Sequence, residues 1–191
     1  MKALKIISGG QTGVDRAALD VALKHGLECG GWCPAGRLDE FGRIPDRYPL
    51  HELEQANTEG RPPDRPREPE TAVSREKRGI FAERTWANVN DSDGTIIIHH
   101  KQPGGGTAYT IECCEHLQRP HQLIDASRIS AESAAKLITD LVRAKNIEIM
   151  NIAGPRQSEW PEGYNYAFRA LDIFLTSCSH RPEGAQGKDA S

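Results

Sequence analysis

Apolar residues along the chain occur in two alternating patterns, short continuous runs and stretches with helical spacing. Residues 4–8 form a short run, and the apolar side chains that follow recur at positions 14, 17, 18 and 21, as on one face of a helix. The same succession returns further along the chain. The pattern predicts strands over 4–8, 27–33, 95–100, 121–125 and 147–153, and helices over 14–26, 79–94, 108–118, 129–145 and 163–175, the second of which ends in a turn.

The run at 95–100 is continuous and apolar, as expected of a central strand that is covered on both faces. Ser130 is placed to cap the start of the helix over 129–145, and Gly26 to cap the end of the helix over 14–26. Strands that alternate with helices favour a parallel sheet with helices packed on both sides. The predicted fold class is therefore α/β, a three-layer, Rossmann-like, doubly wound and mostly parallel sheet in a single domain.

Two stretches lack the pattern of a core element. Residues 34–49 are rich in Pro, Gly, Asp and Arg, which predicts a loop. Residues 54–77 are almost entirely polar, which predicts an exposed insertion. We therefore expect one Rossmann-like nucleotide- or cofactor-binding domain over 1–178, followed by a flexible C-terminal tail over 179–191.

Composition narrows the class of partner. The chain has 24 Lys+Arg and 27 Asp+Glu, and the resulting net charge of -3 provides no overall attraction to nucleic acid or to a membrane. No stretch approaches the roughly 20 apolar residues of a membrane span, and the N-terminal run is too short for a signal peptide, so we expect a cytoplasmic protein. The five cysteines lack the repeated spacing of a zinc site, so we expect reduced thiols and no protein-bound metal.

Glycine-rich segments follow three of the predicted strands. In a parallel sheet the strand-to-helix loops meet at one edge, where ligands of open α/β sheets bind. Glycine lets backbone amides approach a ligand, and the helix start that follows adds a partial positive charge. These loops therefore suit an anion such as a phosphate, although none has the spacing of a dinucleotide-binding or P-loop motif. The ligand-binding residues that this argument predicts are Ser8, Gly9, Gly10, Thr12, Gly13, Gly104, Gly105, Gly106, Thr107, Gly154 and Arg156.

Carboxylates near the same edge are the candidate catalytic groups. Asp15 is a candidate acid or base, but its place at a helix start also suits a capping residue. Glu112 lies one turn into a helix, and its spacing leaves open whether it faces a ligand or solvent. Asp91 and Asp93 precede the strand at 95–100, so we expect them in a turn at the opposite, amino edge.

Five segments that span most of residues 4–175 resemble the "putative molybdenum carrier" family. They are "ISGGQTGVDRAALDVAL", "GWCPAGRLDEFGRIPDRYPL", "RTWANVNDSDGTIII", "GGGTAYT" and "NIAGPRQSEWP". This family is part of a Rossmann-like superfamily that includes the lysine-decarboxylase-like (Lonely Guy) phosphoribohydrolases and DNA-processing protein A. The resemblance implies a homo-oligomeric binding domain whose ligand is the pterin-based molybdenum cofactor (molybdopterin) or a nucleotide. It also implies that the glycine loops hold that ligand, and it adds Gln11 in the first loop and Pro155 and Ser158 in the third to the predicted ligand-binding residues.

The phosphoribohydrolases of this superfamily share a loop sequence similar to P-G-G-x-G-T-x-x-E. The Glu of this motif assists cleavage of an N-glycosidic bond. Here "PGGGTAYTIE" lacks the residue before the third glycine, and Glu112 lies five residues beyond Thr107 instead of three. The favoured hypothesis is therefore a carrier that needs no catalytic group. The alternatives are an N-glycosidic hydrolase that uses Glu112 or Asp15, and a nucleotide sensor with residues 34–79 as a partner surface.

Overall fold

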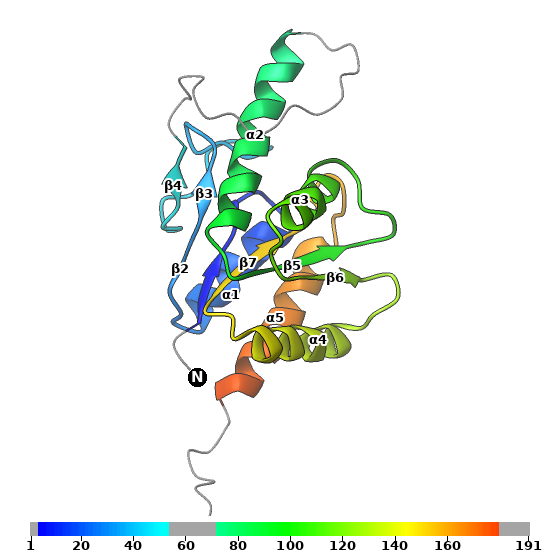
Figure 1. The fold of residues 1–191 in the computed structure, drawn as a ribbon. Coiled ribbons are helices and arrows are strands. Elements are labelled where there is room, and N and C mark those ends of the chain that lie inside the picture. Colours follow the sequence, from blue (N-terminus) through cyan, green and yellow to red (C-terminus); the bar gives the residue numbers. More distant parts are fainter. Residues whose placement is uncertain (1–3, 54–71, 180–191) are drawn as a thin grey trace, which may run out of the picture.

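Five strands form a parallel sheet whose carboxyl ends share one edge. The computed structural model describes residues 4–53 and 72–179 (Figure 1). Neighbouring strands of this sheet all run parallel, in the order β2-β1-β7-β5-β6. The strands are β1 (Lys5–Ile7), β2 (Cys29–Gly30), β5 (Gly94–His99), β6 (His121–Asp125) and β7 (Ile149–Ala153).

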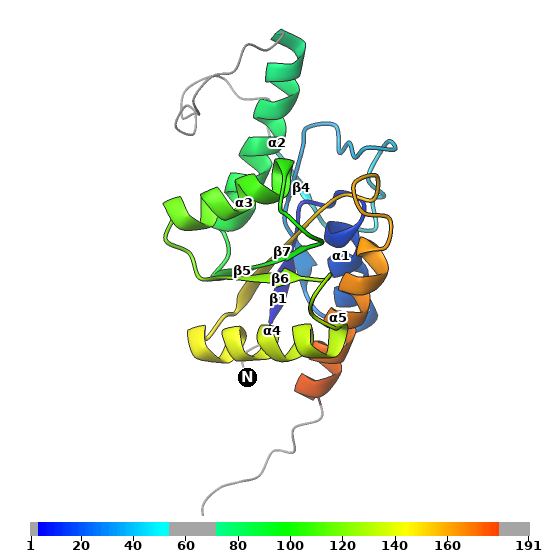
Figure 2. The same ribbon diagram turned by 90° about the vertical axis from the view of Figure 1, so that its right-hand side faces the viewer.

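Helices cover both faces of this sheet (Figures 1 and 2). One face carries α1 (Val14–Lys24), α4 (Ala131–Lys145) and α5 (Gly163–Ser179), with α5 packed against the other two. The opposite face carries α2 (Ala72–Asn90) and α3 (Gly105–His116), which pack on each other. None of these helices, in the described part of the chain, is long and apolar enough to cross a membrane. The predicted three-layer, Rossmann-like α/β fold in a single domain is confirmed.

Strand β5 joins the two layers of the core. All of its residues are buried, and successive side chains of a strand point to opposite faces of the sheet. Ile96 and Ile98 pack in the core that includes α1, α4 and α5, whereas Ile97 packs with Val89 of α2 and Cys113 of α3. Full burial of one such side chain contributes roughly 1.5–3 kcal/mol. The apolar run at 95–100 is thus an interior strand, as predicted.

The predicted strand over 27–33 is divided in two by Gly31. The φ of Gly31 is 124°, and a Cβ at this position would lie 2.2 Å from the carbonyl oxygen of Ser8, so only glycine fits. After this bend the chain leaves the main sheet. Strand β3 (Trp32–Cys33) pairs with β4 (His51–Glu52) in a separate two-stranded sheet. The prediction of one strand over 27–33 is therefore wrong, and β4 was not predicted.

Two helices begin earlier than their patterns predict. Helix α3 begins at Gly105, inside the glycine run, rather than at 108. Helix α2 begins at Ala72, so residues 72–77 of the predicted polar insertion belong to a helix. The rest of that insertion, residues 54–71, and the predicted tail from residue 180 onward lie outside the described residues.

The residues at the ends of α4, α1 and β5 confirm the two predicted helix caps and the predicted turn before the strand at 95–100. The Ser130 hydroxyl accepts from the Ser133 amide at 3.3 Å and caps α4. Gly26 comes directly after His25, the C-cap residue of α1. Its φ of 64° is the left-handed conformation of a glycine that ends a helix. At the amino edge of the sheet, the Asp93 carboxylate accepts from the backbone amides of Glu148 and Ile149.

Candidate functional site

The three predicted glycine loops follow three adjacent strands of the sheet. The first loop (8–13) follows β1, the second loop (104–107) lies after β5, and the third loop (154–158) follows β7. Strand β7 lies between β1 and β5, so the third loop lies between the other two. The predicted convergence of these loops at the carboxyl edge of the sheet is therefore present.

Direct contacts join the third loop to the regions on either side. The Gln157 amide donates to the Thr12 hydroxyl of the first loop at 3.1 Å. On the other side, the His100 ring, which lies just before the second loop, stacks on Trp160 with ring centroids 5.4 Å apart. The third loop therefore contacts the first loop directly, and the segment that follows it contacts the residues that precede the second loop.

Packing explains the glycines where the first and third loops meet. A Cβ on Gly13, where φ is 76°, would lie 2.6 Å from the carbonyl oxygen of Pro155. A Cβ on Gly154 would lie 2.4 Å from the carbonyl oxygen of Ile98. Both distances are far shorter than any normal carbon–oxygen contact, so the fold itself requires glycine at these positions.

Side chains of the protein also cover the start of the first loop. A Cβ on Gly9 would lie 2.6 Å from a guanidinium nitrogen of Arg84, and a Cβ on Gly10 would lie 2.4 Å from Cδ1 of Leu50. The glycines of the first loop therefore make room for the protein's own side chains, and they do not by themselves indicate a ligand.

The second loop is different, because its glycines face open space. Within residues 4–53 and 72–179, and apart from chain neighbours and the nearby helix backbone, no atom lies within 4 Å of a Cβ built on Gly104 or Gly106, and a Cβ on Gly105 would meet one oxygen of Glu159 at 4.0 Å. The φ of Gly104 is −134°, which any residue can adopt. Glycine in a helix costs about 1 kcal/mol relative to alanine, and Gly106 lies in α3. Neither packing nor conformation requires Gly104 and Gly106, so the surface there is free for close approach.

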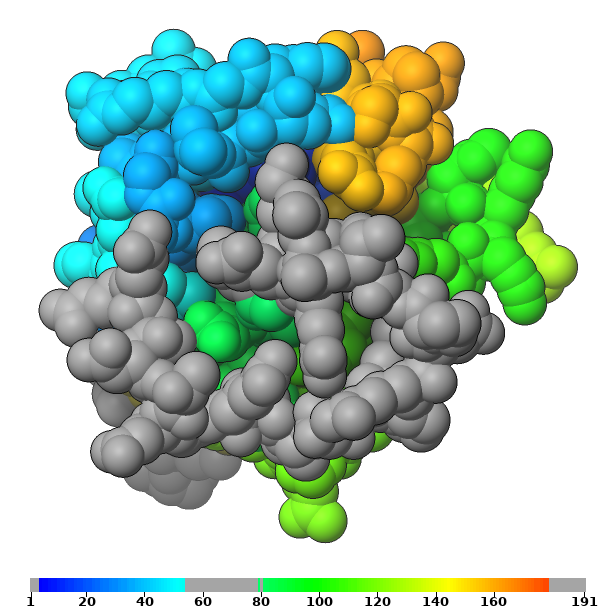
Figure 3. All heavy atoms as spheres, turned by 90° about the horizontal axis from the view of Figure 1, so that it is seen from above, coloured from blue at the N-terminus to red at the C-terminus, as the bar shows by residue number. Residues whose placement is uncertain are grey.

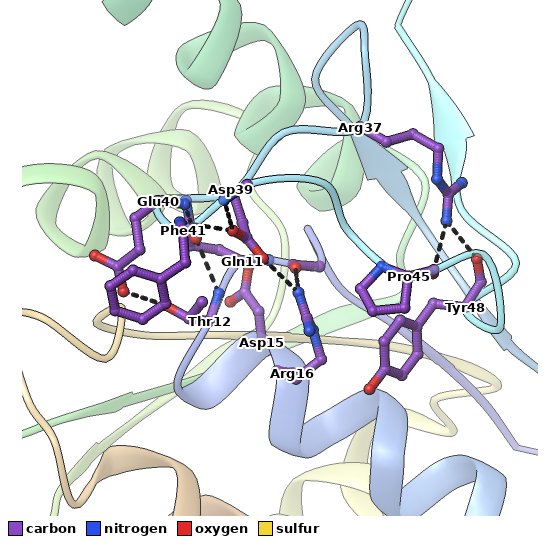
Figure 4. A network of polar contacts seen from close by, with 12 residues as sticks. Gln11, Thr12, Asp15, Arg16, Arg37, Asp39, Glu40, Phe41, Pro45 and Tyr48 are labelled. Atoms are coloured by element: carbon purple, nitrogen blue, oxygen red, sulfur yellow. Dashed lines mark hydrogen bonds and ion pairs between the residues drawn. The ribbon is translucent and has the colours of Figure 1, made fainter.

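A carboxylate that was not predicted as part of the site, that of Glu40, lies between the first and third loops (Figure 4). The hydroxyls of Thr12 and Ser158 donate to its oxygens, and the Ser158 amide donates to it at 3.1 Å. The Arg156 guanidinium lies 3.9 Å away. Burial would raise the pKa of Glu40, but hydrogen bonds from Ser158 and Thr12 outweigh burial and hold the pKa below its ordinary value. Donors of both loops thus already surround an anion.

Glu40 belongs to a turn, residues 39–42, that is held against the first loop and α1. The Glu40 amide donates to Oε1 of Gln11 at 3.1 Å, and Arg16 of α1 forms an ion pair with Asp39 at 2.8 Å (Figure 4). Seen from above, the blue segment that contains this turn lies against the gold segment that follows β7 (Figure 3). Part of the predicted loop over 34–49 is therefore a component of the site.

A cavity of 330 Å³ opens beside this turn. Its size is near the lower end of the range for small-molecule pockets, about 300–1,000 Å³. The walls come from the first and third loops, from the 39–45 segment and from α1 and α5. They are formed by Thr12, Gly13, Arg16, Asp39, Phe41, Gly42, Arg43, Pro45, Gln157 and Tyr164.

Asp15 does not cap α1, so that interpretation is wrong. The N-cap is Gly13, and the Asp15 carboxylate instead accepts from the Gln11 amide at 3.3 Å, with a guanidinium nitrogen of Arg84 at 3.6 Å. Burial raises the pKa of Asp15 to about 6, because desolvation exceeds the opposing effect of Arg84. Such a pKa suits a general acid, but Asp15 is 4% exposed and does not line the cavity.

The remaining predicted residues have different surroundings. Ser8 is fully buried, and its hydroxyl has no hydrogen-bond partner among the described residues. Thr107 is buried in α3. The Arg156 guanidinium is half-exposed and donates to Glu159 at 2.9 Å. Glu112 lies on the exposed side of α3, away from the lining of the cavity.

The five cysteines are free thiols, and all except Cys178 are buried. Burial raises the pKa of the Cys113 thiol to about 11, so this group is not a nucleophile at neutral pH. Within residues 4–53 and 72–179, no group of three or more His, Cys, Asp or Glu side chains is arranged to hold a metal ion.

Sequence reasoning missed Glu40, Asp39, Arg16 and Arg84. Ser158 and Glu40 are 118 positions apart, and Arg84 reaches Gly9 from 75 positions away, so no local spacing links these pairs. The available signal was the high density of acidic and basic residues in 34–49, which is more than a simple connecting loop requires.

Comparison with known proteins identifies the family. A model of the circularly permutated YpsA SLOG family matches residues 6–175. The crystal structure of a "Putative molybdenum carrier protein" from Syntrophus aciditrophicus SB is similar to this chain, with a TM-score of 0.76 and 43% sequence identity over 91% of this chain and 96% of that chain. No curated protein matches. The resemblance seen in the sequence motifs is confirmed, and the chain belongs to the circularly permutated YpsA SLOG family.

Proposed function

We propose that the protein binds an anionic, phosphate-containing small molecule in its glycine loops and carries it without transforming it. The main support is the open surface over the second loop, where Gly104 and Gly106 have neither a conformational nor a packing reason to be glycine. The first amides of a helix have no acceptor within the helix, and Gly104 provides no side chain that could accept from them. A phosphate can therefore approach the start of α3 where any larger side chain would block it.

The molybdenum cofactor is the ligand that the comparison favours, because the similar structure is named a molybdenum carrier. The chain's residues fit the phosphate end of such a group, since the α3 amides and the half-exposed Arg156 supply donors and positive charge. The described residues offer no cluster of side chains for a metal ion, which fits an ion held by the pterin. When bound, the cofactor would supply the metal, and the protein would supply binding and orientation. A nucleotide has the same phosphate chemistry and is the alternative ligand.

The decisive experiment is native mass spectrometry with metal analysis on the protein purified anaerobically from its own organism. Molybdenum with a pterin-sized adduct would support the cofactor, and a nucleotide adduct without molybdenum would support the alternative. The matched variant is Gly104→Val, because the extended backbone at Gly104 accepts valine and its Cβ would have no atom of the described residues, other than chain neighbours, within 4 Å. We expect this variant to lose the adduct while it keeps its Tm. Retention of the adduct would place the ligand elsewhere.

A hydrolase is the second candidate, and the raised pKa of Asp15 is the observation that favours it. Turnover of nucleoside monophosphates that is lost in Asp15→Asn or Glu112→Ala would support an N-glycosidic hydrolase. Neither side chain lines the cavity, so the structure does not favour one over the other as the catalytic group, and both variants are needed. No turnover across a nucleotide panel would favour the carrier.

A further inference from the structure

We propose that the donors around Glu40 form a binding site for a tetrahedral oxyanion, a phosphoryl group or molybdate, and that Glu40 fills this site until the oxyanion displaces it. We call these donors the oxyanion cradle, defined as the hydroxyls of Thr12 and Ser158 and the amide of Ser158. The inference rests on the proposed function in one respect, that the oxyanion belongs to the ligand of the glycine loops.

The oxyanion cradle has the chemistry of an anion site. The Gln157 amide donates to the oxygen of the Thr12 hydroxyl, which directs the hydroxyl hydrogen toward Glu40. Ser158 donates to the same carboxylate through both its amide and its hydroxyl. The Glu40 side chain is 9% exposed in this position. A phosphate oxygen can replace each carboxylate oxygen, because both are acceptors that charge-assisted hydrogen bonds favour.

The turn that carries Glu40 is built as a separate unit. The Asp39 side chain accepts from the amides of Phe41 and Gly42 at 2.8 and 2.9 Å, and the Asp39 amide donates to the Gly42 carbonyl at 2.8 Å. Phe41 is 69% exposed, so apolar packing does not hold the turn against the body of the protein. The turn can therefore leave the oxyanion cradle with its own hydrogen bonds intact, and its departure breaks the hydrogen bond from the Glu40 amide to Gln11 and the ion pair between Asp39 and Arg16.

The base of the same segment is fixed. The buried Arg37 guanidinium donates to the carbonyls of Leu50 and Tyr48 at 3.0 and 2.9 Å. On the two sides of the turn the segment is closed, because the Ile44 amide donates to the Arg37 carbonyl at 2.7 Å. Movement is thus confined to the turn, while the base stays in place.

The oxyanion cradle is continuous with the cavity. Thr12 belongs to the cradle and also lines the cavity, so one ligand can place its oxyanion in the cradle and the rest of its atoms against the cavity walls outside the turn, which include Gly13, Gln157 and Tyr164. Arg16 and Arg43 in the cavity wall carry positive charge, and Asp39 offsets part of it. When the turn leaves, Asp39 leaves with Glu40, so both carboxylates that would repel an anionic ligand are removed together.

A tethered carboxylate lowers the apparent affinity for the ligand, because only the fraction of protein with a free cradle can bind. The test measures binding of inorganic phosphate, molybdate and AMP by calorimetry to the full-length wild type, Glu40→Ala and Glu40→Gln. We expect Glu40→Ala to bind phosphate or molybdate roughly tenfold more tightly or better, since it removes a charge-assisted competitor. Glu40→Gln keeps the shape and the acceptor oxygen, so its gain should be smaller. Adding Ser158→Ala to Glu40→Ala should reverse the gain.

Hydrogen exchange gives a second readout that does not depend on a variant. Saturating phosphate or AMP should speed exchange of the amides at 38–43 in the wild type, whereas a ligand that leaves the turn in place should slow it. Tighter binding of AMP than of phosphate would assign the oxyanion to a larger ligand, and the reverse would assign it to a free ion. Either order of affinity supports the cradle only together with faster exchange at 38–43, and slower exchange there overturns it.

The failures of the two proposals are distinguishable. Unchanged or weaker binding of every probe in Glu40→Ala overturns the oxyanion cradle. If the wild-type protein nevertheless carries an adduct that Gly104→Val removes, the proposed function stands. If Glu40→Ala gains affinity for phosphate while the purified wild-type protein carries no adduct, the cradle stands and the carrier function fails.

Discussion

The carboxylate of Asp15 and the guanidinium of Arg84 lie 3.6 Å apart beside Gly9, with side-chain exposures of 6% and 14%. Arg84 extends from α2 and also donates to the Gly9 carbonyl at 3.1 Å. Helix α1, which contains Asp15, covers the opposite face of the sheet from α2, so this pair joins the two helical layers across the first loop. The ion pair does not fully offset the desolvation of Asp15, since its pKa is raised.

This raised pKa predicts how stability depends on pH. The folded protein keeps a proton on Asp15 up to about pH 6, whereas the unfolded chain releases it near its ordinary value of 3.8. Stability due to Asp15 is therefore lost as the pH rises between these values, and a shift of about two units corresponds to about 3 kcal/mol. We expect the free energy of unfolding of wild type relative to Asp15→Asn to fall by about 2 kcal/mol from pH 4 to 6 and to level off above about pH 7. Urea unfolding across this range measures it, and a constant difference would show that Asp15 titrates normally.

Alanine at Gly106 and at Gly154 should have opposite effects on stability. Gly106 lies in α3 with no atom near its Cβ position, so Gly106→Ala should raise the free energy of unfolding by up to about 1 kcal/mol. At Gly154 the new methyl would lie 2.4 Å from the Ile98 carbonyl oxygen, and overpacking of this kind costs about 1–3 kcal/mol. Chemical denaturation of both variants tests this contrast. Destabilisation by Gly106→Ala would mean that the second loop needs its glycine for the fold.

A second pair of glycines separates backbone strain from steric clash. Gly13 and Gly26 have similar φ values, 76° and 64°, but only a Cβ on Gly13 meets protein atoms, with the Pro155 carbonyl oxygen at 2.6 Å. Gly26→Ala should cost about 1 kcal/mol from strain alone. Gly13→Ala adds a clash with the third loop, so its cost should be about 3 kcal/mol. Equal thermal shifts for the two variants would indicate that the first and third loops separate easily.

The sequence predicts the layers of this fold because each layer depends on local periodicity. The run at 95–100 and the stripe of apolar residues over 129–145 specify an interior strand and an amphipathic helix without reference to the rest of the chain. The bend at Gly31 depends on contact with Ser8, which no pattern within 27–33 can reveal. The glycine loops were found for a reason that is only partly correct, because most of their glycines serve packing. Glu40 was missed because its partners come from two distant loops.

Because the guanidinium of Arg37 is buried, we expect Arg37 to contribute much more than Arg43 to the stability of the 34–52 segment. Arg37 is 7% exposed and donates to the carbonyls of Leu50, Tyr48 and Pro45. Arg37→Met would leave these acceptors without their charged donor, which should cost about 2–4 kcal/mol.

Arg43→Met is the matched control for this prediction. The exposed Arg43 pairs with the exposed Asp46, and such surface pairs contribute little, so this variant should unfold like wild type. Limited proteolysis should then cut the 34–52 segment faster in Arg37→Met and at an unchanged rate in Arg43→Met, with a protease that does not cleave at arginine. Equal stability and equal cleavage in both variants would mean that packing of Tyr48 and Leu50, rather than Arg37, fixes the base of the turn that carries Glu40.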